Sequence, residues 1–221
     1  IPASLQKTAR KIFLDNFTKL FENKKIPFKK NYSCSVPNRL IVLFEGLPNE
    51  ITQQKIEIRG PSTTAPNVAL DGFLRSNNIN QDQIFKKTTE KGEFYFYSKP
   101  GTKFKTHDFL TENIPLILNS IQWKKSMRWG DNNLSWARPL KSILATFQNK
   151  TLEFKFHHIE SSNFTYIDKE FEEKKKIFKN FKSYYDFFNK NKIIIDNNER
   201  KDFIKNELIK HSRKKNLKLH I

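Results

Sequence analysis

The sequence predicts an α+β fold: a mixed, largely antiparallel sheet with packed helices, followed by a helix-rich basic segment. Apolar residues recur every three to four positions in some stretches and at every second position in others, which indicates both helices and strands. These stretches do not follow the regular strand–helix alternation of a doubly wound parallel sheet. With 37% hydrophobic residues and 21 Phe, the 221-residue chain can bury a core. We divide it into an α+β domain over residues 1–160 and a helix–strand–helix segment over residues 161–221, the truncated start of a next domain.

An amphipathic helix is expected first, with Ser4 as its N-cap. Its apolar stripe consists of Leu5, Ala9, Ile12, Phe13, Phe17, Leu20 and Phe21. Two strands follow at residues 32–36 and 40–45, separated by a turn or bulge at Pro37-Asn38. A short alternating strand at 55–59 is expected to end at Gly60.

The middle of the chain mixes short elements of both kinds. Residues 68–76 predict a short helix, and the aromatic run at 93–98 predicts a strand after a turn at Gly92. Residues 106–121 are helical in pattern, but Pro115 must occupy a first turn or a kink, with Asn113 capping a helix that starts there.

A hairpin and a basic helical segment complete the chain. Residues 140–147 and 151–158 predict a hairpin through a short turn, with Leu152, Phe154 and Phe156 on one face. The apolar residues from Phe171 to Phe188 predict a Lys-rich helix, and residues 192–195 predict a short strand. A capping box of Asp196 and Glu199 would open the last helix. Its apolar positions are Phe203, Ile204, Leu208 and Ile209.

Net charge points to a polyanionic partner. Lys and Arg number 41 against 23 acidic residues, so the formal charge is 41 − 23 = +18, which attracts RNA, DNA or acidic lipid surfaces. An A+T-rich coding bias that adds lysine everywhere is an equally open explanation of the charge alone. The longest apolar runs, residues 40–44 and 114–118, are far shorter than the roughly 20 residues of a spanning helix. A single cysteine, Cys34, excludes an internal disulfide and a cysteine-rich zinc module.

Catalytic signatures are missing from the sequence. There is no Gly-x-x-x-x-Gly-Lys loop and no Gly-x-Gly-x-x-Gly motif. The adjacent His157 and His158 would face opposite sides of a strand, so they suit a surface role better than a shared metal. Paired carboxylates such as Glu172-Glu173 lie in charge clusters typical of solvated helices. We therefore expect no catalytic residue, no metal and no cofactor within these 221 residues.

One segment combines cations with aromatic rings. Residues 123–130 hold two indoles and three cations in eight positions, and residues 136–139 repeat the pairing. Indoles and guanidinium groups stack on bases, and lysines neutralise phosphate. Arg59 and Arg75 also lie close to glycines that let a backbone approach. The alternative is structural, with Trp129 and Trp136 in a core and Arg128 and Arg138 holding loop carbonyls. For the set as a whole, RNA contact is favoured.

These segments together resemble the N-terminal part of the β subunit of the heterotetrameric, bacterial-type glycyl-tRNA synthetase. The most specific match is Lys-Ser-Met-Arg-Trp-Gly at 125–130, followed by Trp-Ala-Arg-Pro at 136–139. Other segments resemble the family in order along the chain. They are Ile-Pro-Ala at 1–3, Pro-Asn-Arg-Leu at 37–40, Arg-Gly-Pro at 59–61, Gly-Phe-Leu-Arg at 72–75 and Ile-Ile-Ile-Asp at 193–196.

The resemblance implies a non-catalytic, tRNA-binding subunit of a cytoplasmic glycine–tRNA ligase, an α2β2 heterotetramer with no membrane association. In that family the α subunit uses ATP and Mg²⁺ to activate glycine, and the β subunit binds tRNA(Gly). The region also resembles body and tail parts of archaeal CCA-adding enzymes. The fragment would orient the acceptor arm toward α, and alone it would be inactive. The candidate RNA-binding residues are Lys124, Lys125, Arg128, Arg138, Trp129, Arg59, Arg75 and Arg39. The first four would contact phosphate, and Trp129 would stack on a base or pack the loop.

Two other functions remain open. The chain could be a protein-interaction scaffold for the catalytic subunit, with incidental basic charge. It could also be a free-standing enzyme acting on RNA, which would need the clustered acidic or histidine metal ligands that the sequence does not display.

Overall fold

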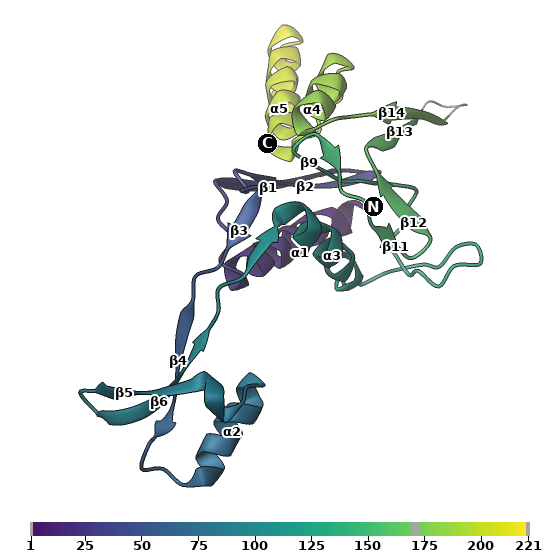
Figure 1. Ribbon diagram of the computed structural model, residues 1–221. Helices are drawn as coiled ribbons and strands as arrows, with labels where there is room; N and C mark the ends of the chain where they lie inside the picture. The colour runs from purple at the N-terminus through teal and green to yellow at the C-terminus, as the bar shows by residue number, and fades with distance from the viewer. Residues whose placement is uncertain (1, 169–172, 220–221) are drawn as a thin grey trace. The chain divides into compact units, whose positions relative to one another are not determined.

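The computed structural model describes residues 2–168 and 173–219 (Figure 1). The chain forms two compact units: unit 1 contains Ile1–Asn49 and Thr106–Ile221, and unit 2 contains Glu50–Lys105. Helices combine with mostly antiparallel strand pairs, which confirms the α+β class. The division at residue 160 was drawn from composition and stays a prediction. In the described part of the chain, no helix is long and apolar enough to cross a membrane.

Helix α1 (Ala3–Asn23) forms along the expected stripe. Its buried residues Ala9, Phe13, Phe17 and Phe21 recur every four positions, and the Phe13 and Phe17 rings lie 5.2 Å apart. The prediction of Ser4 as N-cap is wrong, because Pro2 occupies that position and its carbonyl accepts the first bond, from Leu5 N at 2.9 Å. Proline suits a helix start because it has no N–H to leave unpaired.

Strands β1 (Lys30–Val36) and β2 (Arg39–Glu45) form the predicted antiparallel hairpin. The Ser35 N–H donates to Asn197 Oδ1 at 3.0 Å and the Ser35 carbonyl accepts from Arg200 at 3.3 Å, so the main chain of Ser35 faces away from β2. Ser35 lies opposite Leu40. By the alternation of an antiparallel ladder, the main-chain groups of Leu40 and every second residue after it face away from β1. Among the described strands, β2 pairs only with β1, so this edge has no strand partner.

Helix α3 (Thr106–Asn119) packs against α1 and continues through Pro115. The expected helix start at Asn113 is therefore wrong: the Asn113 side chain donates to the Phe109 carbonyl at 2.8 Å inside the helix and does not cap a new one. An interior proline costs a helix about 3 kcal/mol. Burial of Ile114, Ile117 and Leu118 on both sides of Pro115 offsets this cost.

Short strands follow α3 after a long irregular segment. They are β8 (Ile143–Leu144), β9 (Thr146–Phe147), β10 (Lys150–Thr151), β11 (Lys155–Phe156) and β12 (Ile159–Ser162). The predicted hairpin exists as β9–β10, closed by two residues with positive φ, Gln148 at 50° and Asn149 at 62°. Such a turn matches the right-handed strand twist. The strand regions are shorter than expected, and β8 pairs in parallel with β12.

The region after residue 162 differs most from expectation. Strands β13 (Phe164–Asp168) and β14 (Glu173–Ile177) form an antiparallel pair, so the predicted helix across residues 173–180 is wrong. Phe171, which was expected to mark its start, lies outside the described residues. Lys175 from β14 lies over the ring of Phe164 at 4.8 Å. This cross-strand pairing stabilises a lysine-rich strand that the local sequence alone would make helical.

Helix α4 (Phe181–Lys190) begins after Asn180, and α5 (Asn197–Lys214) begins after Asp196. Asp196 Oδ1 accepts from the Asn198 and Glu199 N–H groups at 2.8 and 2.9 Å, but the Glu199 carboxylate accepts from Tyr185 OH instead of closing a box. The capping-box prediction is therefore half right. Residues 192–195 form no strand: Lys192 has a φ of 60°, outside the extended region, and Ile195 is buried at 1% exposure.

Apart from the phenylalanines buried along α1, a second hydrophobic cluster joins this region to the β1–β2 hairpin. It consists of Val36, Phe178, Tyr184, Phe188 and Ile195. The apolar positions of α5 behave differently: Phe203, Ile204 and Leu208 are 55%, 50% and 50% exposed. Burial of the α4 stripe, and not of α5, therefore anchors the segment.

Unit 2 consists of a two-stranded sheet, a three-stranded sheet and one α-helix. Strand β3 (Glu50–Thr52) pairs with β7 (Lys103–Lys105), and α2 spans Asn67–Asn77. The remaining strands, in spatial order, are β4 (Ile56–Ser62), β6 (Gly92–Lys99) and β5 (Ile84–Thr89). A short 3₁₀ turn, η1 (Gln81–Gln83), precedes β5. Strand β4 does not end at Gly60, because a bulge between Arg59 and Ser62 lets the pairing continue.

Candidate nucleic-acid interface

The segment between α3 and β8 forms a loop whose base is closed by main-chain bonds. Met127 N donates to the Trp136 carbonyl at 2.8 Å, and Trp136 N donates to the Met127 carbonyl at 3.1 Å. Ser135 Oγ donates to Ser126 Oγ at 2.8 Å beside this bridge. Gly130, with φ of 54°, allows the chain to reverse at the tip. We call residues 123–138 the Trp–Arg loop.

Two tryptophans fix this loop to the protein. Trp136 is 6% exposed, and its ring meets Trp123 edge to face at 4.9 Å and Phe156 at 5.7 Å. Such pairs add about 0.5–1.5 kcal/mol beyond their burial. The structural alternative placed both Trp129 and Trp136 in a core. Only Trp136 is buried in the structure.

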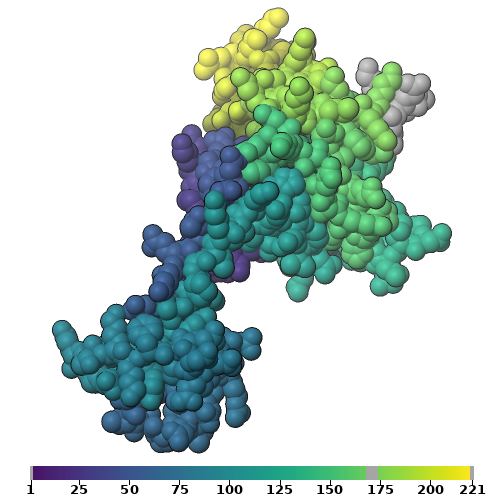
Figure 2. All heavy atoms as spheres, viewed as in Figure 1, coloured from purple at the N-terminus to yellow at the C-terminus, as the bar shows by residue number. Residues whose placement is uncertain are grey.

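The cations of the loop point to solvent. Lys124, Lys125, Arg128 and Arg138 are all exposed, and among the described residues none of them has an ion-pair or hydrogen-bond partner. The loop extends from the rest of unit 1 as an arm, visible in teal at the right of Figure 2. No hydrogen bond within residues 2–168 and 173–219 supports the alternative in which Arg128 and Arg138 hold loop carbonyls.

Trp129 is half-buried and lies edge to face against His158, with ring centroids 5.8 Å apart. His158 belongs to the tight turn between β11 and β12, where His157 has a φ of 52°. One side of the indole therefore packs against the protein. The half-buried indole leaves part of its surface accessible, and its sequence neighbour Arg128 is exposed.

The three other candidate arginines lie elsewhere. The Arg39 Nη2 donates to the Tyr166 carbonyl at 2.7 Å, and its guanidinium lies 4.8 Å from the Phe188 ring centroid, so it ties the hairpin to β13 and α4. Arg75 is exposed in the last turn of α2, and Arg59 lies over the Phe94 ring at 3.5 Å. Both belong to unit 2 and not to the Trp–Arg loop. RNA contact by any of these residues stays a prediction.

A large apolar cleft of about 1180 Å³ lies beside the open edge of β2. Apolar side chains of α1, β2 and α3 line its interior, and four cations line it as well: Arg39, Arg138, Lys141 and Lys182. The sequence offered no signal for this cleft, because it depends on how three separate elements pack. Arg138 thus connects the Trp–Arg loop to the cleft.

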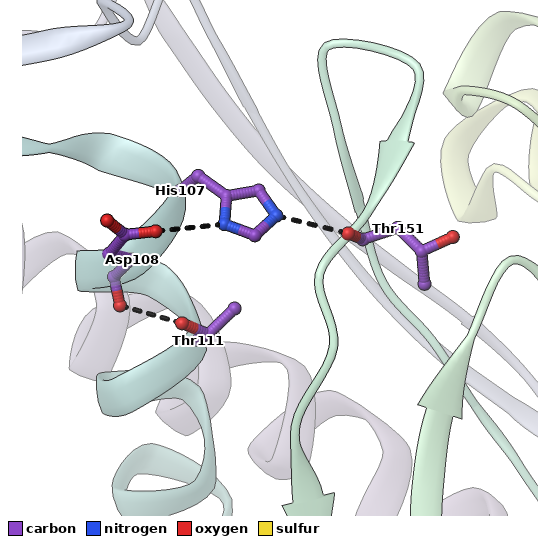
Figure 3. A network of polar contacts seen from close by, with 4 residues as sticks. All are labelled: His107, Asp108, Thr111 and Thr151. Carbon is purple, nitrogen blue, oxygen red and sulfur yellow. Dashed lines mark hydrogen bonds and ion pairs between the residues drawn. The ribbon is translucent and has the colours of Figure 1, made fainter.

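The histidine that forms the most polar contacts has a structural role (Figure 3). His107 Nδ1 lies 3.3 Å from Asp108 Oδ1, and Nε2 lies 3.2 Å from the Thr151 carbonyl. Thr111 Oγ1 donates to the Asp108 carbonyl at 2.8 Å in the next turn. The network links the start of α3 to β10. The described residues contain no group of three or more His, Cys, Asp or Glu placed to hold a metal.

Other titratable groups in unit 1 are held neutral by burial. Burial raises the pKa of the Cys34 thiol and of the Tyr32 hydroxyl, and it raises the pKa of Tyr184 to about 12. A protonated, fully buried thiol is a poor nucleophile.

Comparison with known proteins places the chain in a family. The family model described as "Glycyl-tRNA synthetase beta subunit" matches residues 1–221. The chain belongs to the glycyl-tRNA synthetase beta subunit family. Among relatives named glycine–tRNA ligase beta subunit, it is 34% identical over 217 residues to that of Rickettsia bellii (strain OSU 85-389), covering 98% of this chain and 33% of the relative. The corresponding values for Rickettsia prowazekii (strain Madrid E) are 32% over 219 residues, 99% and 33%. The chain thus spans about a third of the length of these glycine–tRNA ligase beta subunits.

Proposed function

We propose that this chain is a tRNA-docking part of a glycine–tRNA ligase. The observation that carries the proposal is the Trp–Arg loop, in which the buried Trp136 holds four unpaired, exposed cations on a projecting arm. Membership of the beta subunit family supports tRNA as the polyanion in preference to DNA or a lipid surface. The net charge of +18 adds long-range attraction.

Phosphate neutralisation is the mechanism of binding in this proposal. Lys124, Lys125, Arg128 and Arg138 replace counterions on the RNA backbone, and their release into solution favours the complex. Lysine and arginine contacts to phosphate position an RNA without reading its sequence. Trp129 adds stacking on one unpaired base. Selection of tRNA(Gly) therefore needs contacts beyond this loop.

Glycylation itself belongs, in the proposal, to a separate catalytic α subunit that binds ATP, Mg²⁺ and glycine. The beta subunit names of the relatives support the existence of such a partner. The role of this chain is then to hold tRNA so that its acceptor end reaches the other subunit.

The test compares two variants with the same change in net charge. In the first, Lys124, Lys125 and Arg128 are replaced by Glu. The matched control replaces three exposed lysines of α1, Lys7, Lys11 and Lys19, by Glu. tRNA binding is measured by filter retention from low to high salt.

The loop variant is expected to lose about 2 to 3 units from the slope of log K against log salt concentration, roughly 0.9 per phosphate contact. The α1 variant should keep the slope and lose only the weaker long-range attraction. Equal loss in both variants would show that total charge, and not the Trp–Arg loop, governs binding.

A second candidate function has one observation in its favour. The exposed Phe203, Ile204 and Leu208 of α5 form an apolar surface suited to a protein partner. A scaffold for the catalytic subunit would bind that subunit at high salt and would show negligible RNA binding. The two functions can occupy different faces of the same chain.

A further inference from the structure

The three-stranded sheet of unit 2 has one face that carries charges and rings. Directly opposite residues of an antiparallel pair point to the same face, and Arg59 and Phe85 both lie opposite Phe96. This face is called the open face here. Its charged and aromatic side chains are Glu57, Arg59, Phe85, Lys87, Phe94 and Phe96, and its small polar ones are Ser62, Thr89 and Ser98.

Helix α2 packs on the other face. A Cβ atom at Gly60 would lie 2.9 Å from a ring carbon of Phe73, so the α2 ring rests directly on the β4 backbone. The bulge between Arg59 and Ser62 sets Gly60 and Pro61 together opposite Tyr95, which lies on the face of Ile58 and not on that of Arg59. Consistent with this, Lys87 and Glu57 form a solvent-exposed ion pair of 2.7 Å across the open face, with 51% and 45% side-chain exposure. Within unit 2, no helix covers the open face.

Two planar groups on the open face are available for stacking. The Arg59 guanidinium lies over the Phe94 ring at 3.5 Å, and among the described residues it has no carboxylate partner. A guanidinium plane that rests on a ring by one side presents its other side to solvent. Phe85 is 39% exposed and stacks on Phe96 at 6.1 Å with an interplanar angle of 26°. Lys87 adds an ammonium 5.5 Å from the same Phe96 ring.

We propose that the open face of the β4–β6–β5 sheet is a stacking platform for unpaired nucleotides, with Phe85 and the Arg59–Phe94 pair as its two stacking positions. The proposal rests on the tRNA-docking function and specifies a second kind of contact for it. Aromatic and guanidinium planes on a sheet bind bases whose faces are free, which duplex RNA does not offer. The Trp–Arg loop would neutralise backbone phosphate, while the platform would hold single-stranded nucleotides.

RNA suits this face better than a protein does. A protein interface has an apolar core depleted of charge. Here cations lie beside the rings of this face: Arg59 lies over the Phe94 ring, and Lys87 lies 5.5 Å from the ring of Phe96, which is buried beneath Phe85 and Lys87. Cations beside rings match the alternation of phosphate and base along a single strand.

The experiment measures fluorescence anisotropy of a labelled single-stranded oligoribonucleotide of about 10 nucleotides, mixed with the 221-residue chain. The same sequence annealed as a duplex is the comparison probe. Phe85→Leu keeps apolar bulk but removes the ring, and Phe85→Tyr restores a ring. Arg59→Lys keeps the charge but removes the plane. Ile56→Ala, on the opposite face and 47% exposed, is the matched control.

Phe85→Leu and Arg59→Lys should each weaken single-strand binding about 5-fold or more, since stacking contributes at least ~1 kcal/mol per base. Phe85→Tyr and Ile56→Ala should bind like the parent chain. Circular dichroism melting measures whether each variant is folded. If Phe85→Leu folds poorly, Arg59→Lys still tests the platform, because it removes only the guanidinium plane of an exposed side chain. Unchanged single-strand binding in both Phe85→Leu and Arg59→Lys overturns the platform, as does an equal loss for single strand and duplex.

Failure of the platform and failure of the proposed function give different results. If tRNA binding falls with the Glu replacements of the Trp–Arg loop but the platform variants bind the oligonucleotide normally, only the platform is wrong. If the parent chain binds the oligonucleotide through Phe85 but does not bind tRNA, only the docking function is wrong. Loss of catalytic-subunit binding in Phe85→Leu, with oligonucleotide binding intact, would assign the open face to a protein partner and reject the platform.

Discussion

Replacing Trp136 by Ala should destabilise the protein far more than replacing Trp129 by Ala. Trp136 is 6% exposed and packs between two aromatic rings. A buried tryptophan removes about 200 Å² from water, which at ~25 cal/mol per Å² is close to 5 kcal/mol. Measured Trp→Ala losses in cores are about 3–5 kcal/mol. Trp129 is half-buried, with a ring contact to His158, so we expect about 1–2 kcal/mol.

Urea denaturation followed by far-ultraviolet circular dichroism measures both losses, since the signal does not depend on tryptophan. Against a total stability of about 5–15 kcal/mol, the Trp136→Ala loss should lower the midpoint clearly. RNA binding is measured under conditions where each variant stays folded. There, Trp129→Ala should weaken RNA binding, because the proposed stacking surface is lost. Equal midpoints for the two variants would refute the assignment of Trp136 to the core and Trp129 to the surface.

Three further predictions concern the second hydrophobic cluster and the helix beside it. Ile195→Ala should lower the free energy of unfolding by about 2–5 kcal/mol, because the side chain is 1% exposed; a loss below ~1 kcal/mol in urea denaturation would contradict its place in the cluster. Asp196→Ala should cost about 1 kcal/mol, because two N–H groups of α5 lose their acceptor, whereas Asp196→Asn should cost much less in the same assay. The pKa of Tyr184, raised by burial to about 12, makes stability fall above pH 10, where the unfolded hydroxyl ionises and the folded one does not. Roughly 2–3 kcal/mol should be lost by pH 12, and Tyr184→Phe should flatten that dependence in thermal melts; an unaltered slope would show that Tyr184 is not the group responsible.

The elements predicted correctly are those specified by local signals. The four-residue spacing of phenylalanines defines α1, and the turn residues Gln148-Asn149 define the β9–β10 hairpin. The helix predicted over residues 173–177 was wrong, because lysine and glutamate favour helices in isolation, whereas here the strand forms through pairing with β13. Residues 192–195 contain a β-branched run typical of strands, yet Ile195 is used to fill a cluster contributed by α4 and β1.

The candidate interface was predicted in composition but not in arrangement. Spacing alone placed Lys124, Lys125 and Arg128 together, and the structure leaves them exposed. The sequence spacing could not distinguish Trp136 from Trp129, because both stand close to cations in the sequence. Their different burial results only from tertiary packing. The open face of unit 2 was missed, because its residues come from three strands and meet only through their register.

The unpaired edge of β2 has a consequence for how the protein behaves in a test tube. A bare strand edge is a template on which another copy of the chain can add its own strand. At low ionic strength, mutual repulsion between molecules of charge +18 opposes such association. Added salt screens that repulsion over a Debye length of about 10 Å at 0.1 M. The salt concentrations that release RNA therefore also favour aggregation of the RNA-free protein. Salt titrations should use the lowest protein concentration at which binding can be measured.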